Sequence, residues 1–524
     1  MDLIKVVDPK VNVKPDVDKN HLVYVGGERV TYTTSTADSW DTAVTNATWS
    51  IVPPSDKTII DRNVQVRCYF RVTAVGEDFD FGTVDALRQL PINTLVDVTQ
   101  VQINGESISE NTGSTIHALM CYGNDAATRT EHLSSSPSMP DAFQFYNQAF
   151  LIGNARSPLN DYGENDAEPP RGGFEYVAVN NREALFVVTE PLFLSPFQQY
   201  QQMDEGFINV NSLRVSLRFK SALDRILSHD IVNKPNMTGV QVAFYQAPDL
   251  LINYITPSIT QPLPELQVLP YHQMQQYIKD FGPVNAGAEL TVLSDTIRLS
   301  VIPEKIYLFC AHSEATKGFT VSDSFMAIEN VQVSWGNQSG LLSSASPQQL
   351  YKLSRENGLN VDFQGFRKHR GSVVCLRMGK DIGLQANESV GVNGSYNIQV
   401  QMKVKNTSEA VFTPTFYMAV CNTGTFSIGS NSARASIGNL TSDMVLMARG
   451  SDAEMDYHMA FAGGKGKFWS GLKRFAHKLA GTVSKLAVPV ASAFGSPELG
   501  LAIKSGADVA RNLTRGGRLS GGRM

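Results

Sequence analysis

The sequence predicts an all-β protein built from two consecutive β-sheet domains. Apolar and polar residues alternate with a period of two over many short segments, as in strands that place one face in a core. Clusters of Gly, Pro, Asn and Asp separate these segments, as turns require. A Pro-rich stretch over 256–270 divides the segments into two groups of about eight, the strand count of a jelly roll.

The alternation is clearest in three segments, at 64–72, 213–220 and 396–404. In the first of these, Val64, Val66 and Cys68 point to one face while Gln65 and Arg67 point to the other. Further strands are predicted at 23–34, 48–52, 184–189, 240–245, 296–302, 306–310, 327–335, 373–377 and 412–420.

The predicted organisation is a double jelly roll of two eight-stranded domains with long inserted loops and a short basic helical tail. The boundaries are an amino-terminal arm at 1–20, a first jelly roll at 21–255 with a long loop at 106–182, a linker at 256–270, a second jelly roll at 271–450 and a carboxy-terminal tail at 451–524. One helix is specified within the second roll: Ser346 caps it, Pro347 begins it, Gln349 completes a capping box and Gly358 ends it.

Charge is divided unevenly along the chain. The 524 residues carry a net charge of -5, but the segment from Gly463 onward contains eleven Lys and Arg residues against two Asp and Glu. The tail therefore has a net charge of +9 and the remaining 462 residues a net charge of -14. An acidic body argues against nucleic-acid binding over the whole surface, whereas the tail favours contact with an anionic partner.

Cysteine and histidine usage indicates neither a disulfide framework nor a metal site. The five cysteines are widely spaced and three lie in predicted strands, so we expect buried, reduced thiols. The nine histidines are scattered. We expect His312 and His369 to lie in solvated loops, and we expect no cofactor.

Signatures of catalysis are missing from the sequence, which contains no P-loop, no G-x-S-x-G and no H-E-x-x-H motif. The acidic cluster Glu77-Asp78-Phe-Asp80 could supply a pair of carboxylates for a glycosidase. A solvated loop between strands explains the cluster better, and we expect no enzyme. A carbohydrate-active β-sandwich protein remains the alternative from another class.

Short motifs in a fixed order resemble the double jelly-roll major capsid proteins of polinton-like viruses, adintovirus-type elements and virophages, the lineage of the adenovirus hexon. The resemblance covers roughly residues 20 to 445. The motifs that carry it include Ile59-Ile-Asp-Arg62, Ile103-Asn-Gly105, Glu190-Pro-Leu-Phe-Leu-Ser-Pro196, Ile302-Pro-Glu-Lys-Ile-Tyr307, Asp323-Ser-Phe325, Asn357-Gly358, Gly371-Ser-Val-Val-Cys375 and Asp381-Ile-Gly-Leu384.

The resemblance implies a structural role in the capsid of a double-stranded DNA virus. It implies homotrimers with a pseudo-hexagonal outline that tile an icosahedral shell and meet neighbouring capsomers, a single jelly-roll vertex protein and minor capsid proteins. It also implies assembly inside the host cell, in the cytoplasm or the nucleus. A vertex or spike protein is the alternative within the virion, although such proteins usually carry one jelly roll.

The tail has three competing interpretations. Residues 467–480 predict a helix with an apolar and a basic face, which suits contact with DNA or an internal membrane. The contact residues would be Phe468, Trp469, Leu472, Lys473, Arg474, Phe475, Lys478, Arg515, Arg518 and Arg523. Alternatively, a helix packs on the inner base of the trimer and the end of the chain is disordered.

The third interpretation is removal of the tail during maturation. Leu519-Ser-Gly-Gly522 before Arg523 resembles the sites of adenovirus-type maturation proteases. Phe461-Ala-Gly-Gly464 before Lys465 resembles them less closely, because Phe461 replaces an aliphatic residue. The candidate cleavage positions are therefore Gly463, Gly464 and Lys465, and Gly521, Gly522 and Arg523.

Overall fold

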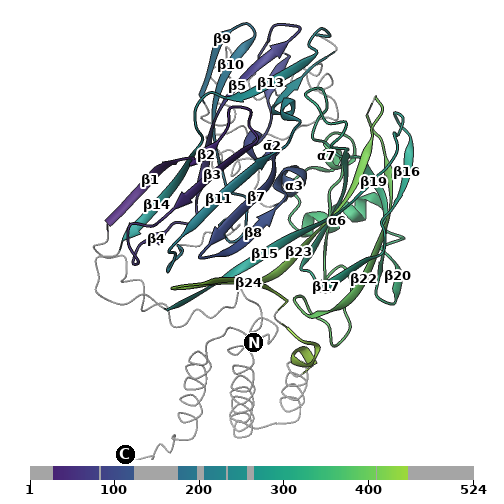
Figure 1. Cartoon of the computed structure of the whole chain (residues 1–524). Helices are drawn as coiled ribbons and strands as arrows, with labels where there is room; N and C mark the ends of the chain where they lie inside the picture. The colour runs from purple at the N-terminus through teal and green to yellow at the C-terminus, as the bar shows by residue number, and fades with distance from the viewer. Residues whose placement is uncertain are drawn as a thin grey trace, which may run out of the picture. The chain divides into compact units, whose positions relative to one another are not determined.

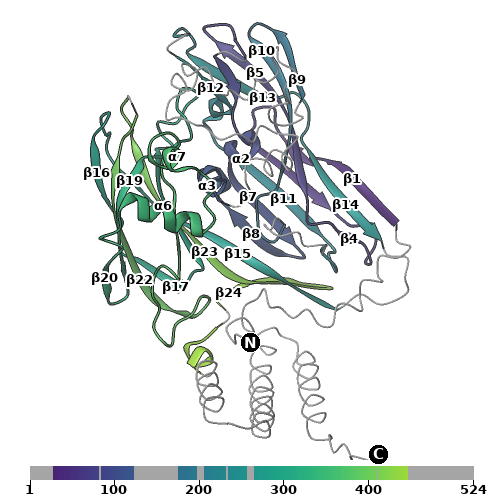
Figure 2. The same cartoon turned by 180° about the vertical axis from the view of Figure 1, so that it is seen from behind.

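The computed structural model describes residues 28–81, 84–122, 175–197, 206–231, 234–256, 265–408, 410–438 and 440–446. Two groups of antiparallel sheets account for most of them, one built from strands β1 to β14 and the other from strands β15 to β24 (Figures 1 and 2). The proposed arm at 1–20 and nearly all of the proposed tail at 451–524 lie outside the described residues.

The first jelly roll consists of two sheets that face each other. One sheet contains β1 (Glu28–Thr36), β14 (Asp249–Thr256), β5 (Gln65–Val75), β10 (Glu183–Pro191) and β9 (Glu175–Asn180), with β13 (Gly239–Phe244) and β4 (Ile59–Ile60) at its side. The other contains β2 (Ser39–Trp40), β3 (Asn46–Ile51), β11 (Leu213–Phe219), β7 (Val96–Ile103) and β8 (Glu106–Glu110). Strands β6 (Asp85–Leu87) and β12 (Leu227–His229), helices α2 (Pro91–Leu95) and α3 (Thr112–Leu119) and the 3-10 helix η4 (Leu223–Ile226) connect them.

The second jelly roll repeats this plan. One sheet contains β15 (Leu266–Asp280), β23 (Pro414–Gly429), β18 (Lys305–His312) and β21 (Val374–Arg377), with β24 (Ala433–Ile437) beside β23. The other contains β16 (Glu289–Leu293), β22 (Asn393–Lys405), β19 (Ala327–Trp335) and β20 (Gln338–Leu341), with β17 (Ile297–Val301) also paired to β22. Helices α6 (Pro347–Glu356) and α7 (Phe363–Arg367) lie between β20 and β21 in the chain.

The strand order shows that the two rolls have one topology. Numbered along the chain, the principal strands of the first roll pair in the orders 1-8-3-6 (β1-β14-β5-β10) and 2-7-4-5 (β3-β11-β7-β8). The second roll has the same two orders, as β15-β23-β18-β21 and β16-β22-β19-β20. This interleaving of two four-stranded sheets is the jelly-roll arrangement. The predicted double jelly roll is confirmed.

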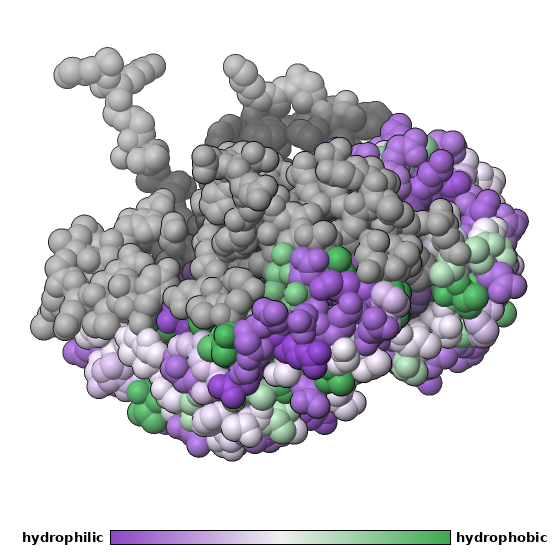
Figure 3. Space-filling view, turned by 90° about the horizontal axis from the view of Figure 1, so that it is seen from above, coloured by the Kyte–Doolittle hydropathy of each residue, from purple (hydrophilic) through white to green (hydrophobic). Residues whose placement is uncertain are grey.

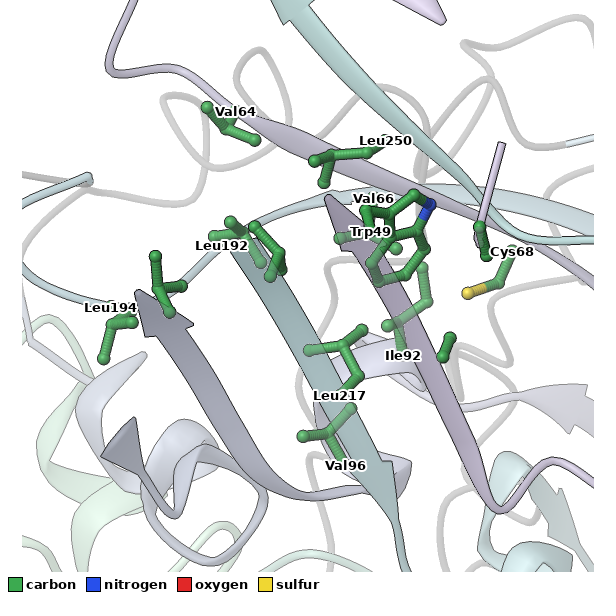
Figure 4. Packing of buried hydrophobic residues seen from close by; sticks show 14 of the residues in the cluster. Trp49, Val64, Val66, Cys68, Ile92, Val96, Leu192, Leu194, Leu217 and Leu250 are labelled. Atoms are coloured by element: carbon green, nitrogen blue, oxygen red, sulfur yellow. The ribbon is translucent and has the colours of Figure 1, made fainter. Parts of the chain in front are cut away.

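The core of the first roll forms because alternate residues of facing strands point inward. Along β5 every second residue from Val66 to Ala74 is buried, whereas Arg71 and Val75 on the opposite face are exposed. Figure 4 shows Trp49 and Leu217 of one sheet and Val66 and Cys68 of the other in the same apolar cluster. Figure 3 shows apolar residues scattered among polar ones on the described part of the visible face, which is ordinary for a folded surface.

Most predicted strands are confirmed, and the helix begins and ends as predicted. The Ser346 side chain accepts a hydrogen bond from Gln349 N while the Gln349 side chain accepts one from Ser346 N, and Gly358 follows with φ +105°. The segment 106–182 differs from the single loop that was predicted. It begins with β8 and α3 and ends just after β9, while 123–174 lie outside the described residues. Strand β15 also begins at Leu266, inside the predicted linker.

The expectation for the cysteines is confirmed, since all five are free and Cys421 alone among them is only half-buried. The expectation for His312 is wrong. This residue ends β18, is buried, and stacks on Phe412 with ring centres 3.5 Å apart, because the strand runs two residues past its predicted end. His369 is exposed as expected. No helix within the described ranges is long and apolar enough to cross a membrane.

Candidate functional site: the interface between the two jelly rolls

The strongest concentration of buried polar groups in the described residues lies where the two jelly rolls meet. The first roll contributes the segment after β6, helix α3 and the 3-10 helix η4. The second roll contributes the connection from β18 to β19, residues 313–326. Apolar and charged contacts both cross this interface.

Asp323 is the centre of the charged contacts. One of its oxygens lies 3.0 Å from Arg88 Nη1 and the other lies 2.7 Å from Arg225 Nη2. Both arginines belong to the first roll, and all three side chains are at most 4% exposed. Arg88 also donates to the carbonyls of Gly318 and Val321, so it holds both the side chain and the backbone of the connection.

Glu314 forms a second centre nearer to solvent. Its carboxylate accepts from Arg225 Nη1 at 2.9 Å, from Lys220 Nζ at 3.1 Å and from Lys317 Nζ at 2.9 Å. Arg225 therefore bridges Glu314 and Asp323. We call Arg88, Arg225, Asp323, Glu314, Lys220 and Lys317 the inter-roll network.

The network shifts the pKa values of its own members and of its neighbours. Burial disfavours the charged form of Asp323, but the two arginines outweigh it and hold its pKa well below the usual range. Burial also opposes ionisation of Glu314, and the charges of Lys317, Arg225 and Lys220 nevertheless lower its pKa to about 2. Burial lowers the pKa of His117 to about 3, so the ring next to Asp323 is neutral at pH 7.

Apolar side chains form the other half of the interface. Leu269 and Tyr271 of β15 and Phe426 and Ile428 of β23 are buried in the core cluster of the first roll. Phe319 reaches the same cluster from the 313–326 connection. The first roll thus completes its core with residues of the second, so we infer that the two cannot be separated without exposing apolar surface.

At the interface, side chains of the first roll accept hydrogen bonds from backbone N–H groups at the sheet edge of the second roll. Glu106 Oε1 accepts from Ala435 N at 3.0 Å, and Glu110 Oε1 accepts from Met274 N at 3.3 Å. Burial raises the pKa of Glu110 to about 8. Edge N–H groups of the second roll are in this way satisfied by side chains of the first.

Several of the motifs that carry the family resemblance contact one another in the folded structure. Arg62 Nε donates to Pro196 O at 2.8 Å, which joins the motif at 59–62 to the motif at 190–196. Asn357 Nδ2 donates to Cys375 O at 2.8 Å and to Asp381 Oδ2 at 2.6 Å, which joins three more.

Two further motifs depend on glycine. Gly371 has φ +89°, and a Cβ there would lie 1.8 Å from Phe325 O, in the motif that begins with Asp323. Asn104 and Gly105, with φ of +45° and +89°, form the two-residue turn between β7 and β8. Asn104 Nδ2 also donates to Gly429 O across the interface at 3.1 Å.

The described residues do not include the predicted contact and cleavage residues, all of which lie beyond residue 446. Side chains of the acidic cluster at 77–80 form hydrogen bonds to neighbouring loops. Glu77 accepts from Asn236 N at 3.1 Å, and Asp78 accepts from Arg182 Nε at 2.7 Å.

Sequence reasoning missed the inter-roll network. Its one available signal was Arg88, a charge inside the otherwise uncharged run from Ala86 to Leu90.

The sequence matches capsid proteins of virophages along most of its length. Residues 2–185 match the model for the Sputnik virophage major capsid protein first domain, and residues 274–370 and 368–424 match that for the major capsid protein V20 C-terminal domain. The chain is 30% identical to the putative capsid protein V20 of Sputnik virophage over 528 residues, covering 93% of this chain and 88% of that protein. The chain belongs to the virophage major capsid protein family.

Solved structures share the fold of this virophage major capsid protein. The cryo-EM structure of Sputnik virophage matches with a TM-score of 0.74 and 29% identity, covering 80% of this chain and 91% of that chain. The crystal structure of mavirus major capsid protein matches with a TM-score of 0.63 and 17% identity over 79% of this chain and 92% of that one, which shows the fold alone. The protein is a structural component of the virion capsid, and the carbohydrate-active alternative is wrong.

Proposed function

We propose that three copies of this major capsid protein form a capsomer with a pseudo-hexagonal outline, and that such capsomers tile an icosahedral shell around double-stranded DNA. The repeated strand order supports this proposal, since three chains with two similar rolls each present six similar units. The inter-roll network supports it further, because buried ion pairs join the two rolls of each chain. The capsomers meet one another, a single jelly-roll vertex protein and minor capsid proteins, and they assemble inside the host cell, in the cytoplasm or the nucleus.

Light scattering tests the trimer. We expect the purified protein to have a mass near three times 57.3 kDa. A stable monomer at micromolar concentration would contradict the proposal. Electron microscopy of the assembled protein then tests the outline of the capsomer.

We propose that the basic tail contacts DNA or a membrane inside the shell. Its net charge of +9 from Gly463 onward supports contact with an anionic partner. The chain truncated after Gly464 should lose binding to DNA or anionic vesicles at low salt, and unchanged binding would reject the proposal.

Two sets of tail variants distinguish the partners. Replacing Lys473, Arg474 and Lys478 by Gln should reduce the salt dependence of DNA binding by about 0.9 in slope for each lost phosphate contact. Replacing Phe468, Trp469, Leu472 and Phe475 by Ala should weaken vesicle binding while leaving that slope unchanged. The clustered arginines Arg515, Arg518 and Arg523 would add to the electrostatic term.

Removal of the tail by a maturation protease is a separate proposal. Cleavage after Gly464 or Gly522 would release a fragment that mass spectrometry of mature particles detects. Gly464→Val should block cleavage before Lys465 and leave cleavage before Arg523 intact. Particles that contain only the full-length chain would reject the proposal.

A further inference from the structure

Within the chain, one side of the first roll binds the outer edge of β15. Met274 N donates to Oε1 of Glu110, the last residue of β8, at 3.3 Å. Gln276 Nε2 donates to the carbonyl of Asn111, just before α3, at 2.7 Å. The contact thus joins the first strand of the second roll to the fifth strand of the first roll and to the helix that follows it.

Residue pairing shows which residues of β1 correspond to those of β15. In each roll, one row of paired residues crosses a sheet through the first residue of the third principal strand and the last residue of the sixth. In the second roll this row is Met274, Cys421, Lys305 and Arg377. In the first roll it is Thr34, Leu251, Gln65 and Pro191. Thr34 therefore corresponds to Met274, and Thr36 corresponds to Gln276.

The outer edge of β1 is unpaired at these two residues. Ala37 N donates to Pro248 O at 2.9 Å, so the alternation of an antiparallel ladder directs the N–H groups of Thr34 and Thr36 away from β14. No described residue accepts a backbone hydrogen bond from either group, and both residues are exposed. An unpaired strand edge of this kind is a surface that another chain can bind.

The second roll repeats the side that binds β15. In each roll the fifth strand is followed by a helix, which is α3 in the first roll and α6 in the second. Thr99, the fourth residue of β7, pairs with Glu110. Asn330, the fourth residue of β19, donates from Nδ2 to Ser343 O at 2.9 Å. Ser343 and its neighbour Ser344 therefore occupy the place of Glu110, and both are exposed.

We propose that the end of β20 and the start of α6 of one copy bind the outer edge of β1 of a second copy, with Ser343 and Ser344 next to Thr34. This inference rests on the proposed trimer and assigns its contact surfaces. Figures 1 and 2 show β1 and α6 well apart within the chain, so one chain cannot form this contact alone.

The repeat explains why a second copy is the partner. The corresponding sides of the two rolls already bind one another inside each chain, at β8, α3 and β15. A head-to-tail contact between copies closes into a ring when its rotation allows. In a closed ring of three copies, each roll would then meet both of its neighbours through contacts of one kind.

Engineered cysteines test the contact in the full chain. Thr34→Cys and Ser344→Cys are combined, and the protein is treated with a short bismaleimide. We expect covalent trimers as the largest product on a denaturing gel, because each copy would be joined to both neighbours. Thr34→Cys alone, Ser344→Cys alone and the parent chain should remain monomeric on the same gel, since four of the five native cysteines are buried.

The control pair combines Thr34→Cys with Thr291→Cys. Thr291 is exposed on β16, which forms the opposite edge of the sheet that ends with β20. This pair should give no covalent trimer.

A disruptive substitution provides a second measurement. Ser344→Arg places a long charged side chain in the contact and should shift the mass measured by light scattering from trimer toward monomer. Thr291→Arg, on the opposite edge, should leave the trimer intact.

The outcomes separate this contact from the trimer itself. The contact is overturned, and the trimer stands, if the parent chain is trimeric but the Thr34→Cys/Ser344→Cys variant cross-links no more than the control pair. A trimer unaffected by Ser344→Arg would overturn it as well. A monomeric parent chain would contradict the proposed trimer and this contact together.

Discussion

The two halves of the inter-roll interface join the same domains by different physical means. In the apolar half, Leu269, Tyr271, Phe426 and Ile428 of the second roll enter the core of the first. In the charged half, Asp323 and Glu314 are surrounded by cations that lie mostly on the first roll. Apolar burial supplies free energy without strong directionality, whereas ion pairs and hydrogen bonds depend on angle and distance.

This difference suggests that the two halves of the interface have different roles. The apolar half keeps the rolls together, and the charged half fixes their relative orientation. A capsid protein that must present two rolls in a fixed geometry needs both. Substitutions can weaken each half separately, so the two roles can be tested one residue at a time.

The largest effect is expected for Asp323→Ala. Its removal leaves Arg88 and Arg225 buried without their shared counter-charge, and breaking a buried pair in this way costs about 3–5 kcal/mol. Chemical denaturation of the full chain measures the loss. Asp295→Ala is the matched control, because Asp295 is 79% exposed in its pair with Lys279 and its removal should cost about 0–1 kcal/mol. Equal losses for the two variants would contradict a special role for the network.

A comparable loss is expected in the apolar half for Phe426→Ala. Phe426 is fully buried in the core of the first roll although it belongs to a strand of the second, and removal of a buried Phe side chain costs about 3–5 kcal/mol. Phe309→Ala is the control, since Phe309 is equally buried on β18 and stacks on Tyr417 of β23, both within the second roll. If the rolls unfold as one unit, both variants should shift a single calorimetric transition. Two transitions, with Phe426→Ala shifting both and Phe309→Ala shifting one, would show that the rolls unfold separately.

The repeated fold could be predicted from the sequence because it depends on local patterns. Alternation predicted β5, β11 and β22, and a capping box predicted α6. Strand β15 was not predicted, because the mainly polar run from His272 to Gln276 does not alternate. At this run the strand leaves the core of the first roll, and its residues from His272 onward are half-buried or exposed. His312 was misplaced for a related reason, since a histidine at the end of a strand carries no local sign of burial.

The inter-roll network could not be predicted, because its members lie far apart in the chain. Arg88 and Asp323 are separated by 235 residues, and no periodic pattern connects them. Asp323 belongs to one of the motifs that carry the family resemblance. That motif indicates the protein family, but it does not indicate which residues pair with Asp323. Ion pairs of this kind follow from the way the two rolls pack, which the sequence does not display locally.

The interface should also respond to pH through Glu110. Burial raises the pKa of Glu110 to about 8 from its ordinary value of 4.5, so the folded protein holds a proton that the unfolded chain releases. The resulting stability is fully present below about pH 4.5 and is lost as the pH rises through 8. Glu110→Gln, which is neutral at every pH, should remove on the order of 4 kcal/mol of this dependence in denaturation curves recorded from pH 5 to 9.

Glu289→Gln is a control for which the pH dependence of stability has the opposite sign. Lys403, at 2.7 Å, lowers the pKa of Glu289, so its contribution is present at high pH and is lost as the pH falls. A Glu110→Gln curve that follows the parent chain from pH 5 to 9 would exclude Glu110 as the source of the pH dependence.

The smallest effect is expected for a neutral hydrogen bond across the interface. Gln276 Nε2 donates to Asn111 O at 2.7 Å and to Thr115 Oγ1 at 3.4 Å, and its Oε1 accepts from Ser114 Oγ at 2.7 Å. One side chain of β15 therefore contacts three residues of the first roll. Gln276→Ala should cost about 0.5–1.5 kcal/mol in denaturation experiments. The adjacent Gln275 contacts Gln273 of its own strand at 3.2 Å, so Gln275→Ala should change stability by less than about 0.5 kcal/mol. If both substitutions were neutral, uncharged polar contacts would contribute little to holding the rolls, and orientation would depend on the buried ions alone.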